Sequence, residues 1–83
     1  MTQRSRIMLY ALSTCAWCKK TKRLLNQLGV PYEFVDVDLL DPDEERAVQR
    51  TLDRLNPEGG YPVIVIGNEV ISGFDESRIR EAI

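Results

Sequence analysis

The sequence contains no histidine and only two cysteines among its 83 residues. The missing histidine removes the commonest metal ligand of proteins and the usual general base of enzymes. Two cysteines are also too few for a structural zinc site within one chain, because such a site takes about four ligands. A shared metal site would need the cysteines of two chains.

Long hydrophobic runs are missing as well, because the longest one near the N-terminus covers only residues 7–12. Six residues are too few for the core of a signal peptide, and no stretch approaches the length of a membrane span. The charges nearly balance, at a net charge of −2, so nothing favours binding to nucleic acid or to an anionic membrane. We therefore expect a cytoplasmic protein, a monomer with a single domain over residues 1–83.

Hydrophobic periodicity predicts the elements of the first half of the chain. Residues 7–12 form an almost continuous apolar run, which is typical of a central strand buried on both faces. Residues 16–28 show helical spacing, and Gly29 is well placed to end that helix. A second strand is predicted over residues 32–38, and the first six residues are expected to be loosely ordered. The apolar face of the first helix is formed by Thr21, Leu24, Leu25 and Leu28.

The second half begins with a strong helix start at Asp41, where Pro42 and Glu44 complete the pattern of a capped first turn. That helix is predicted to end at residues 56–57. Strands are predicted over residues 62–66 and 69–71, joined by a Gly-Asn turn as a hairpin. Asp75 is expected to cap a last helix that turns Ile79 and Ile83 inward.

The resulting order is β-α-β-α-β-β-α. The first two strands are expected to be parallel, through a right-handed crossover, and the last two antiparallel. The sequence therefore predicts an α/β protein with a four-stranded mixed sheet and helices on both faces.

Cys15 and Cys18 form a Cys-x-x-Cys motif at the point where a buried strand ends and a helix begins. Free N–H groups and the positive end of the dipole at a helix N-terminus stabilise an anion, which favours the thiolate of Cys15. Cys18 lies three residues on, on the same side of the helix and deeper, from where it can close a disulfide with Cys15. The placement predicts a redox pair, with Cys15 as the nucleophile and Cys18 as the resolving cysteine.

Two alternatives use the same sulfur atoms. Two thiolates suit Cu(I), and the segment around the motif is similar to the start of a copper chaperone. That fold has two strands directly after its first helix, whereas here one strand is followed by a capped helix at Asp41. The second alternative is an iron–sulfur cluster held between two chains.

Charged and aromatic residues surround the motif. The basic run of Lys19, Lys20, Lys22 and Arg23 is interpreted mainly as a solvated helix face, although one or two of these residues can contact an acidic partner. The acidic run over residues 41–45 is interpreted as a helix start favoured by the dipole. Trp17, between two reactive cysteines, is expected at the rim of the site, where it would contact substrates.

The chain resembles the glutaredoxins over nearly all of its length. Cys15, Cys18, Thr21 and Lys22, followed by the Leu pair at 24–25, fit the frame of the glutaredoxin active-site helix. The segments 61–63 and 71–75 match the proline strand start and the glycine turn of that family. The resemblance implies a thioredoxin-like fold and two-electron exchange with the disulfides of proteins or of glutathione, with no bound organic cofactor and no metal.

The resemblance also implies a substrate groove. It implies a cis bond before Pro62, which would turn the backbone of Tyr61 toward the nucleophile so that an extended substrate pairs there. Asp75 matches the position that holds the amino group of glutathione. The full set of implied binding residues is Trp17, Lys19, Tyr61, Pro62, Gly73, Phe74 and Asp75.

Three departures from the family frame concern the reductant. Leu12 stands where glutaredoxins carry a basic residue that contacts glutathione, so we expect weaker glutathione binding, with Lys19 as the best compensating residue. Ala16 and Trp17 replace the usual proline and tyrosine. Residues 72–74 are similar to the glutaredoxin-like proteins that reduce ribonucleotide reductase and are recharged by thioredoxin reductase with NADPH. The sequence thus leaves two electron sources open, glutathione and a reductase.

Overall fold

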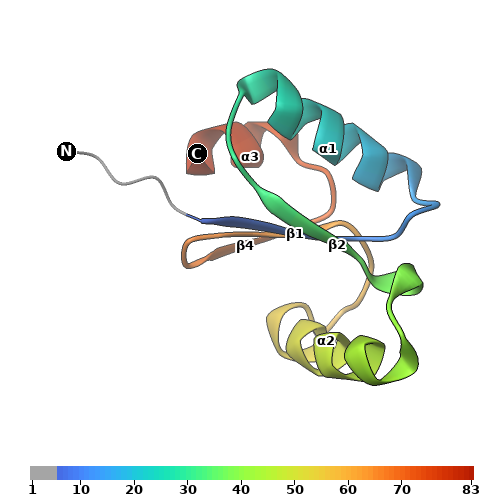
Figure 1. Ribbon diagram of the computed structural model, residues 1–83. Helices are drawn as coiled ribbons and strands as arrows, with labels where there is room; N and C mark the ends of the chain where they lie inside the picture. The colour runs from blue at the N-terminus through green and yellow to red at the C-terminus, as the bar shows by residue number, and fades with distance from the viewer. Residues whose placement is uncertain (1–5) are drawn as a thin grey trace.

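The computed structural model describes residues 6–83, and its elements follow the predicted order. One four-stranded sheet, in the order β2-β1-β3-β4, separates α1 and α3 on one face from α2 on the other (Figure 1). This is the α/β thioredoxin-like arrangement, with three helices. The prediction for the first six residues concerns mainly residues 1–5, which lie outside the described residues.

Strand β1 (Ile7–Ala11) lies inside the sheet, as its apolar sequence predicts. It pairs in parallel with β2 (Glu33–Asp36) and antiparallel with β3 (Val63–Ile66). Alternate residues of β1 are fully buried and the others half-buried, because the α1 face is covered more completely than the α2 face. The central position of β1 directs its carboxyl end toward the start of the first helix.

Helix α1 (Ala16–Leu28) turns one apolar face to the sheet, and Thr21, Leu24 and Leu25 are buried there. Gly29 ends the helix in the left-handed conformation, with φ of 68°, and its N–H donates to the carbonyl of Asn26. A side chain disfavours this conformation, so the glycine fixes where the helix stops.

After β2 the chain makes a short 3₁₀ turn, η1 (Val37–Leu39), before α2 (Pro42–Leu55). The prediction of a strand over residues 32–38 was therefore too long, because Val37 turns inward from η1 into a small second core. Asp41 caps α2 as predicted, its carboxylate accepting from the N–H of Glu44 at 2.9 Å. Only Leu52 of α2 is fully buried.

Strands β3 and β4 (Glu69–Ser72) form the predicted hairpin, and Asp75 caps α3 (Glu76–Ala82) by accepting from the N–H of Arg78. Ile79 is fully buried, but Ile83 is 46% exposed, so the prediction that it turns inward is wrong. The helix ends one residue earlier, at Ala82, which leaves Ile83 beyond the last turn.

The two outer strands each begin with a glutamate that forms an ion pair. Glu33 of β2 accepts from Arg6 at 2.9 Å, and Glu69 of β4 accepts from Arg78 at 3.1 Å. Both edges of the sheet thus carry paired charges.

Candidate active site

Cys15 and Cys18 lie at the junction between the end of β1 and the start of α1. Cys15 is the residue that caps α1, with its backbone still extended, and its N–H donates to the carbonyl of Leu12 at 3.2 Å. The N–H of Cys18 donates to Sγ of Cys15, also at 3.2 Å. A free amide at the helix start therefore points at the Cys15 sulfur, which is the arrangement that stabilises a thiolate.

The two sulfur atoms differ in exposure. Cys15 is half-buried, whereas Cys18 is 0% exposed and belongs to the main core. Burial is the main cause that raises the pKa of the Cys18 thiol to about 12, and the hydrogen bond with Cys15 adds to it. At neutral pH Cys18 keeps its proton, so only Cys15 is placed for a first attack on a substrate.

Trp17 lies at the rim, as predicted, with 55% of its surface exposed. Its ring stacks on Phe74, at 5.7 Å between centroids and 26° between planes. Nζ of Lys20 lies 4.7 Å from the centre of the indole ring, within the range of a cation–π contact. No local sequence pattern predicts this contact, because residues 17 and 74 lie far apart along the chain.

The residues predicted to form the rest of the substrate groove lie in the segments around Pro62 and Gly73. The peptide bond between Tyr61 and Pro62 is cis, as the resemblance implies. The carbonyl of Pro62 accepts from the N–H of Gly73 at 2.8 Å, which joins the proline segment to the glycine turn. Gly73 has a φ of 80°, and Phe74 follows it directly. One hydrogen bond thus joins the segment of Tyr61 and Pro62 to that of Gly73 and Phe74.

Asn56 organises the loop that leads to Tyr61, a role that sequence reasoning missed. It is buried, and its side-chain amide donates to the carbonyl of Gly59 at 2.8 Å. Its own carbonyl accepts from the N–H of Gly59. The sequence signal for this role is an asparagine that directly follows a helix and precedes a pair of glycines by three residues.

The basic residues of α1 lie in different surroundings. Lys19 is exposed. Lys22 is half-buried, pairs with Asp36 at 3.0 Å and lies 4.2 Å from the centre of the Phe34 ring. Its interpretation as part of a solvated face was therefore wrong for this one residue. Asp75 is exposed, and one of its oxygens is engaged in capping α3.

Ser13 and Asp38 make a contact beside the cysteines that the sequence did not predict. The carboxylate of Asp38 accepts from the N–H of Ser13 at 2.8 Å and from its hydroxyl group. These hydrogen bonds hold the pKa of Asp38 below its usual range, so the group is ionised at neutral pH. A negative charge is thereby fixed next to the loop that carries Cys15.

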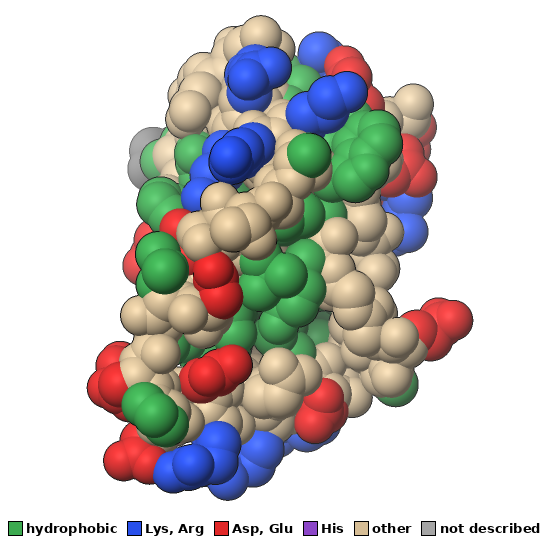
Figure 2. Space-filling model, turned by 90° about the vertical axis from the view of Figure 1, so that its right-hand side faces the viewer, with side chains coloured by type: hydrophobic (Ala, Val, Ile, Leu, Met, Phe, Trp, Pro, Cys, Tyr) green, Lys and Arg blue, Asp and Glu red, His purple; other side chains and the backbone are tan. Residues whose placement is uncertain are grey.

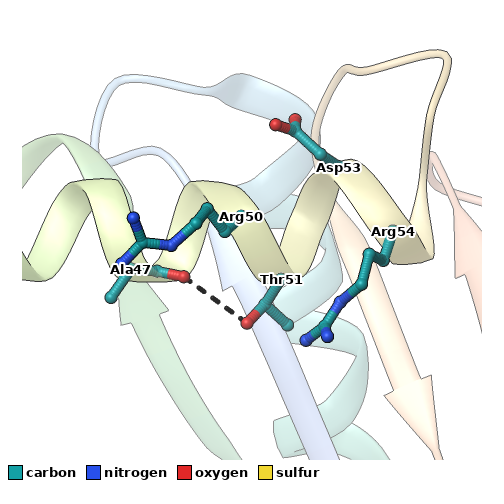
Figure 3. A pocket seen from close by; sticks show the side chains of 5 residues that line it. All are labelled: Ala47, Arg50, Thr51, Asp53 and Arg54. Atoms are coloured by element: carbon teal, nitrogen blue, oxygen red, sulfur yellow. Dashed lines mark hydrogen bonds between the residues drawn. The ribbon is translucent and has the colours of Figure 1, made fainter.

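Figure 2 shows the end of the molecule that holds this loop. Hydrophobic side chains form a band through the middle, with Lys and Arg side chains above it and several Asp and Glu side chains below it, and further Lys and Arg side chains lie at the bottom edge (Figure 2). A separate shallow pocket runs along the outside of α2 (Figure 3), where Asp53 and Arg54 extend to opposite edges. All of its lining residues come from α2, and none belongs to the predicted site.

No group of three or more His, Cys, Asp or Glu residues within residues 6–83 is arranged to hold a metal ion. Over the same part of the chain, no helix is both long enough and apolar enough to cross a membrane.

Comparison with known proteins matches residues 7–71 to the glutaredoxin family. The chain is 39% identical over 77 residues to a glutaredoxin-like 8.6 kDa protein in the rubredoxin operon of Clostridium pasteurianum, covering 93% of this chain and 96% of that one. Among solved structures, methanoredoxin of Methanosarcina acetivorans is 46% identical, with a TM-score of 0.91 over 95% of this chain and 84% of that one. NrdH-redoxin of Escherichia coli, a glutaredoxin-like protein with a thioredoxin-like activity profile, is 28% identical, with a TM-score of 0.69 and 92% of each chain covered.

Proposed function

Since the chain belongs to the glutaredoxin family of thiol–disulfide oxidoreductases, we propose that it reduces disulfides through Cys15 and Cys18 as a dithiol pair. The observation that carries this proposal is the contrast between the two sulfur atoms. A helix-start amide points at the partly exposed Cys15, while Cys18 is buried three residues further on and protonated.

The first step is the attack of the Cys15 thiolate on a substrate disulfide. A mixed disulfide forms, and one substrate sulfur leaves as a thiolate that takes up a proton. Cys18 then loses its proton and attacks Sγ of Cys15, which releases the second substrate sulfur. The substrate gains two electrons, and the protein is left with a disulfide between Cys15 and Cys18.

An external reductant must return those two electrons. The resemblance to glutaredoxins points to glutathione as this reductant, whereas the segment at residues 72–74 points to a thioredoxin reductase with NADPH. NrdH-redoxin, which shares this fold, is described by its thioredoxin-like activity, and this favours the second source. We further propose that the protein works as a monomer in the reducing cytoplasm, on disulfide-containing proteins that include ribonucleotide reductase.

The substrate is proposed to lie between the two walls of the groove. Trp17 and Phe74 would contact it on one side, and the backbone of Tyr61 before Pro62 would pair with it on the other. Lys19, Gly73 and Asp75 would contribute where glutathione is the substrate.

The test is to supply oxidised protein with glutathione, and separately with thioredoxin reductase and NADPH, and to follow thiol formation. We expect reduction by at least one of them, faster with the reductase. Cys18→Ser should accumulate mixed disulfides with substrate, and Cys15→Ser should accumulate none. Equal trapping by both variants would overturn the assignment of roles. A coloured, metal-containing protein after anaerobic purification, without disulfide reduction, would overturn the proposed function.

A further inference from the structure

The loop that carries the reactive sulfur also holds a carboxylate, that of Asp38. Asp38 is exposed, yet its carboxylate is fixed by the N–H and the hydroxyl group of Ser13. Ser13 precedes Cys15 by two residues, so the loop that presents the sulfur also holds the carboxylate. The position of this charge is therefore set by the active-site loop and not by a mobile side chain alone.

Other residues on the side of the site that holds Asp38 are likewise acidic or uncharged. Leu12, directly before Ser13, is apolar and packs toward the second core, so it brings no cation to this wall. The carboxylates of Glu45 and Asp38 both act on the hydroxyl group of Tyr61, whose pKa is raised mainly by burial. Among residues 6–83, neither Asp38 nor Glu45 forms an ion pair with a Lys or Arg side chain. The Tyr61 side of the groove is thus acidic, and the cation that acts on Asp38, Lys22, is itself paired with Asp36.

The opposite wall carries the other sign. Lys20 lies over the Trp17 ring, and Lys19 is exposed beside it. Within the described residues, neither lysine pairs with a carboxylate. Figure 2 shows Lys and Arg side chains above the hydrophobic band and Asp and Glu side chains directly below it, with further Lys and Arg side chains at the bottom edge. A substrate that crosses the band from one wall to the other therefore meets charges of opposite sign.

We propose that Asp38 is a specificity-determining residue, which selects disulfide-bearing protein segments that carry a Lys or Arg next to the reacting cysteine on the Tyr61 side. This inference rests on the proposed function and names its substrate class. A cation there meets the fixed carboxylate of Asp38, and the rest of the segment lies on the apolar band and the Trp17 wall. A substrate carboxylate in the same place meets a like charge, so small acidic thiols such as glutathione are disfavoured.

The experiment uses three synthetic peptides that differ only in the residue next to a single cysteine, which is Lys, Gln or Glu. Each cysteine is joined to thionitrobenzoate as a mixed disulfide, and release of the coloured thiol by the reduced protein gives a second-order rate constant. We expect the Lys peptide to react about tenfold faster than the Glu peptide at low salt, with the ratio falling as salt is added.

The variants assign the effect to its residue. Asp38→Asn should lower the ratio of the Lys rate to the Glu rate by about threefold to fivefold. The matched control Glu81→Gln removes an exposed carboxylate from α3 and should leave the ratio unchanged. Ser13→Ala, which removes one of the two groups holding the carboxylate, should lower the ratio by a smaller factor. If Asp38→Asn folds poorly, Ser13→Ala and the salt series on the wild-type protein still test the proposal.

Three outcomes overturn the proposal. The first is a ratio near one at low salt, and the second is a ratio that Asp38→Asn and Glu81→Gln lower equally. The third is a ratio that depends on protein concentration, which would show that a second copy of the chain covers this face. If none of the peptides reacts, the Gln peptide included, the proposed function itself has failed. Reaction of all three at one rate leaves that function standing and removes only the role of Asp38.

Discussion

Helices α1 and α2 are nearly equal in length, with 13 and 14 residues, but they are held to the sheet very differently. Helix α1 buries four residues and shares its core with α3, whereas α2 buries only Leu52. Both cysteines lie on the α1 side. The reactive sulfur is therefore held by the better-packed half of the molecule, while the α2 side supplies mainly surface and charge.

The largest expected effect concerns the two sulfur atoms of the α1 side. With a pKa of about 12, Cys18 has a thiolate fraction of about 1 in 10,000 at pH 8. Under limiting iodoacetamide at that pH, we expect Cys15 to be alkylated about a hundredfold faster than Cys18, or more. Peptide mass spectrometry measures both rates. Unfolding the protein in guanidinium is the control, because it should bring the two rates close together. Faster labelling of Cys18 in the folded protein would reverse the assigned roles.

The packing difference predicts unequal costs for the same truncation. Leu25→Ala removes a side chain that is 0% exposed in the main core, and we expect the free energy of unfolding to fall by about 3–4 kcal/mol. Leu52→Ala acts on the smaller core and should cost about 2–3 kcal/mol. Denaturant titrations compare the two, with the exposed Leu39→Ala as the control that should change little. An equal or larger cost at Leu52 would contradict the comparison.

Cys18 also makes the α1 side sensitive to high pH. Its pKa is raised in the folded protein from an ordinary value of 9.0 to about 12, so the folded state keeps a proton that the unfolded chain loses. The stability linked to this group is therefore complete below pH 9 and declines as the pH rises toward 12, by up to about 1.4 kcal/mol per pH unit. Subtracting the pH profile of Cys18→Ala from that of the wild type isolates this slope. A difference that stays flat above pH 9 would show that Cys18 ionises freely in the folded protein.

The smallest effect belongs to the start of α2. Because this helix is weakly packed, its cap contributes a large share of its local stability, and Asp41→Ala should cost about 1 kcal/mol. The matched control is Asp43→Ala, in the same first turn, whose side chain pairs only with Arg46 of the same helix. Amide hydrogen exchange should show faster opening at the start of α2 in the first variant only. Unchanged exchange in Asp41→Ala would mean that packing, and not the cap, holds this end.

The sequence predicted those parts of the fold that local chemistry decides. The ends of helices follow from residues that act within one turn, such as Gly29, Asp41 and Asp75, and the structure confirms all three. The end of β2 was misplaced, because Val37 is as suitable for a strand as for the 3₁₀ turn in which it lies. Only its burial in the second core decides between the two.

The site was predictable in its position but not in its surroundings. The cysteine spacing and the strand-to-helix junction located the two sulfur atoms from residues 15–18 alone. The stacking of Trp17 on Phe74 and the bonds from Ser13 to Asp38 join residues 57 and 25 positions apart, so no local pattern indicates them. Lys22 was misjudged for the same reason, because its partner Asp36 lies on a different element.

The glutamates that form ion pairs at the starts of the two outer strands affect whether the protein aggregates at high concentration. The open backbone edges of β2 and β4 are templates on which another chain could add a strand and start an aggregate. Each edge begins instead with a glutamate that forms an ion pair, with Arg6 in one case and with Arg78 in the other. An incoming strand would have to strip water from these charges, which disfavours edge-to-edge pairing of sheets. The molecule can therefore display an exposed tryptophan at its reactive end while its sheet edges discourage fibre-like assembly.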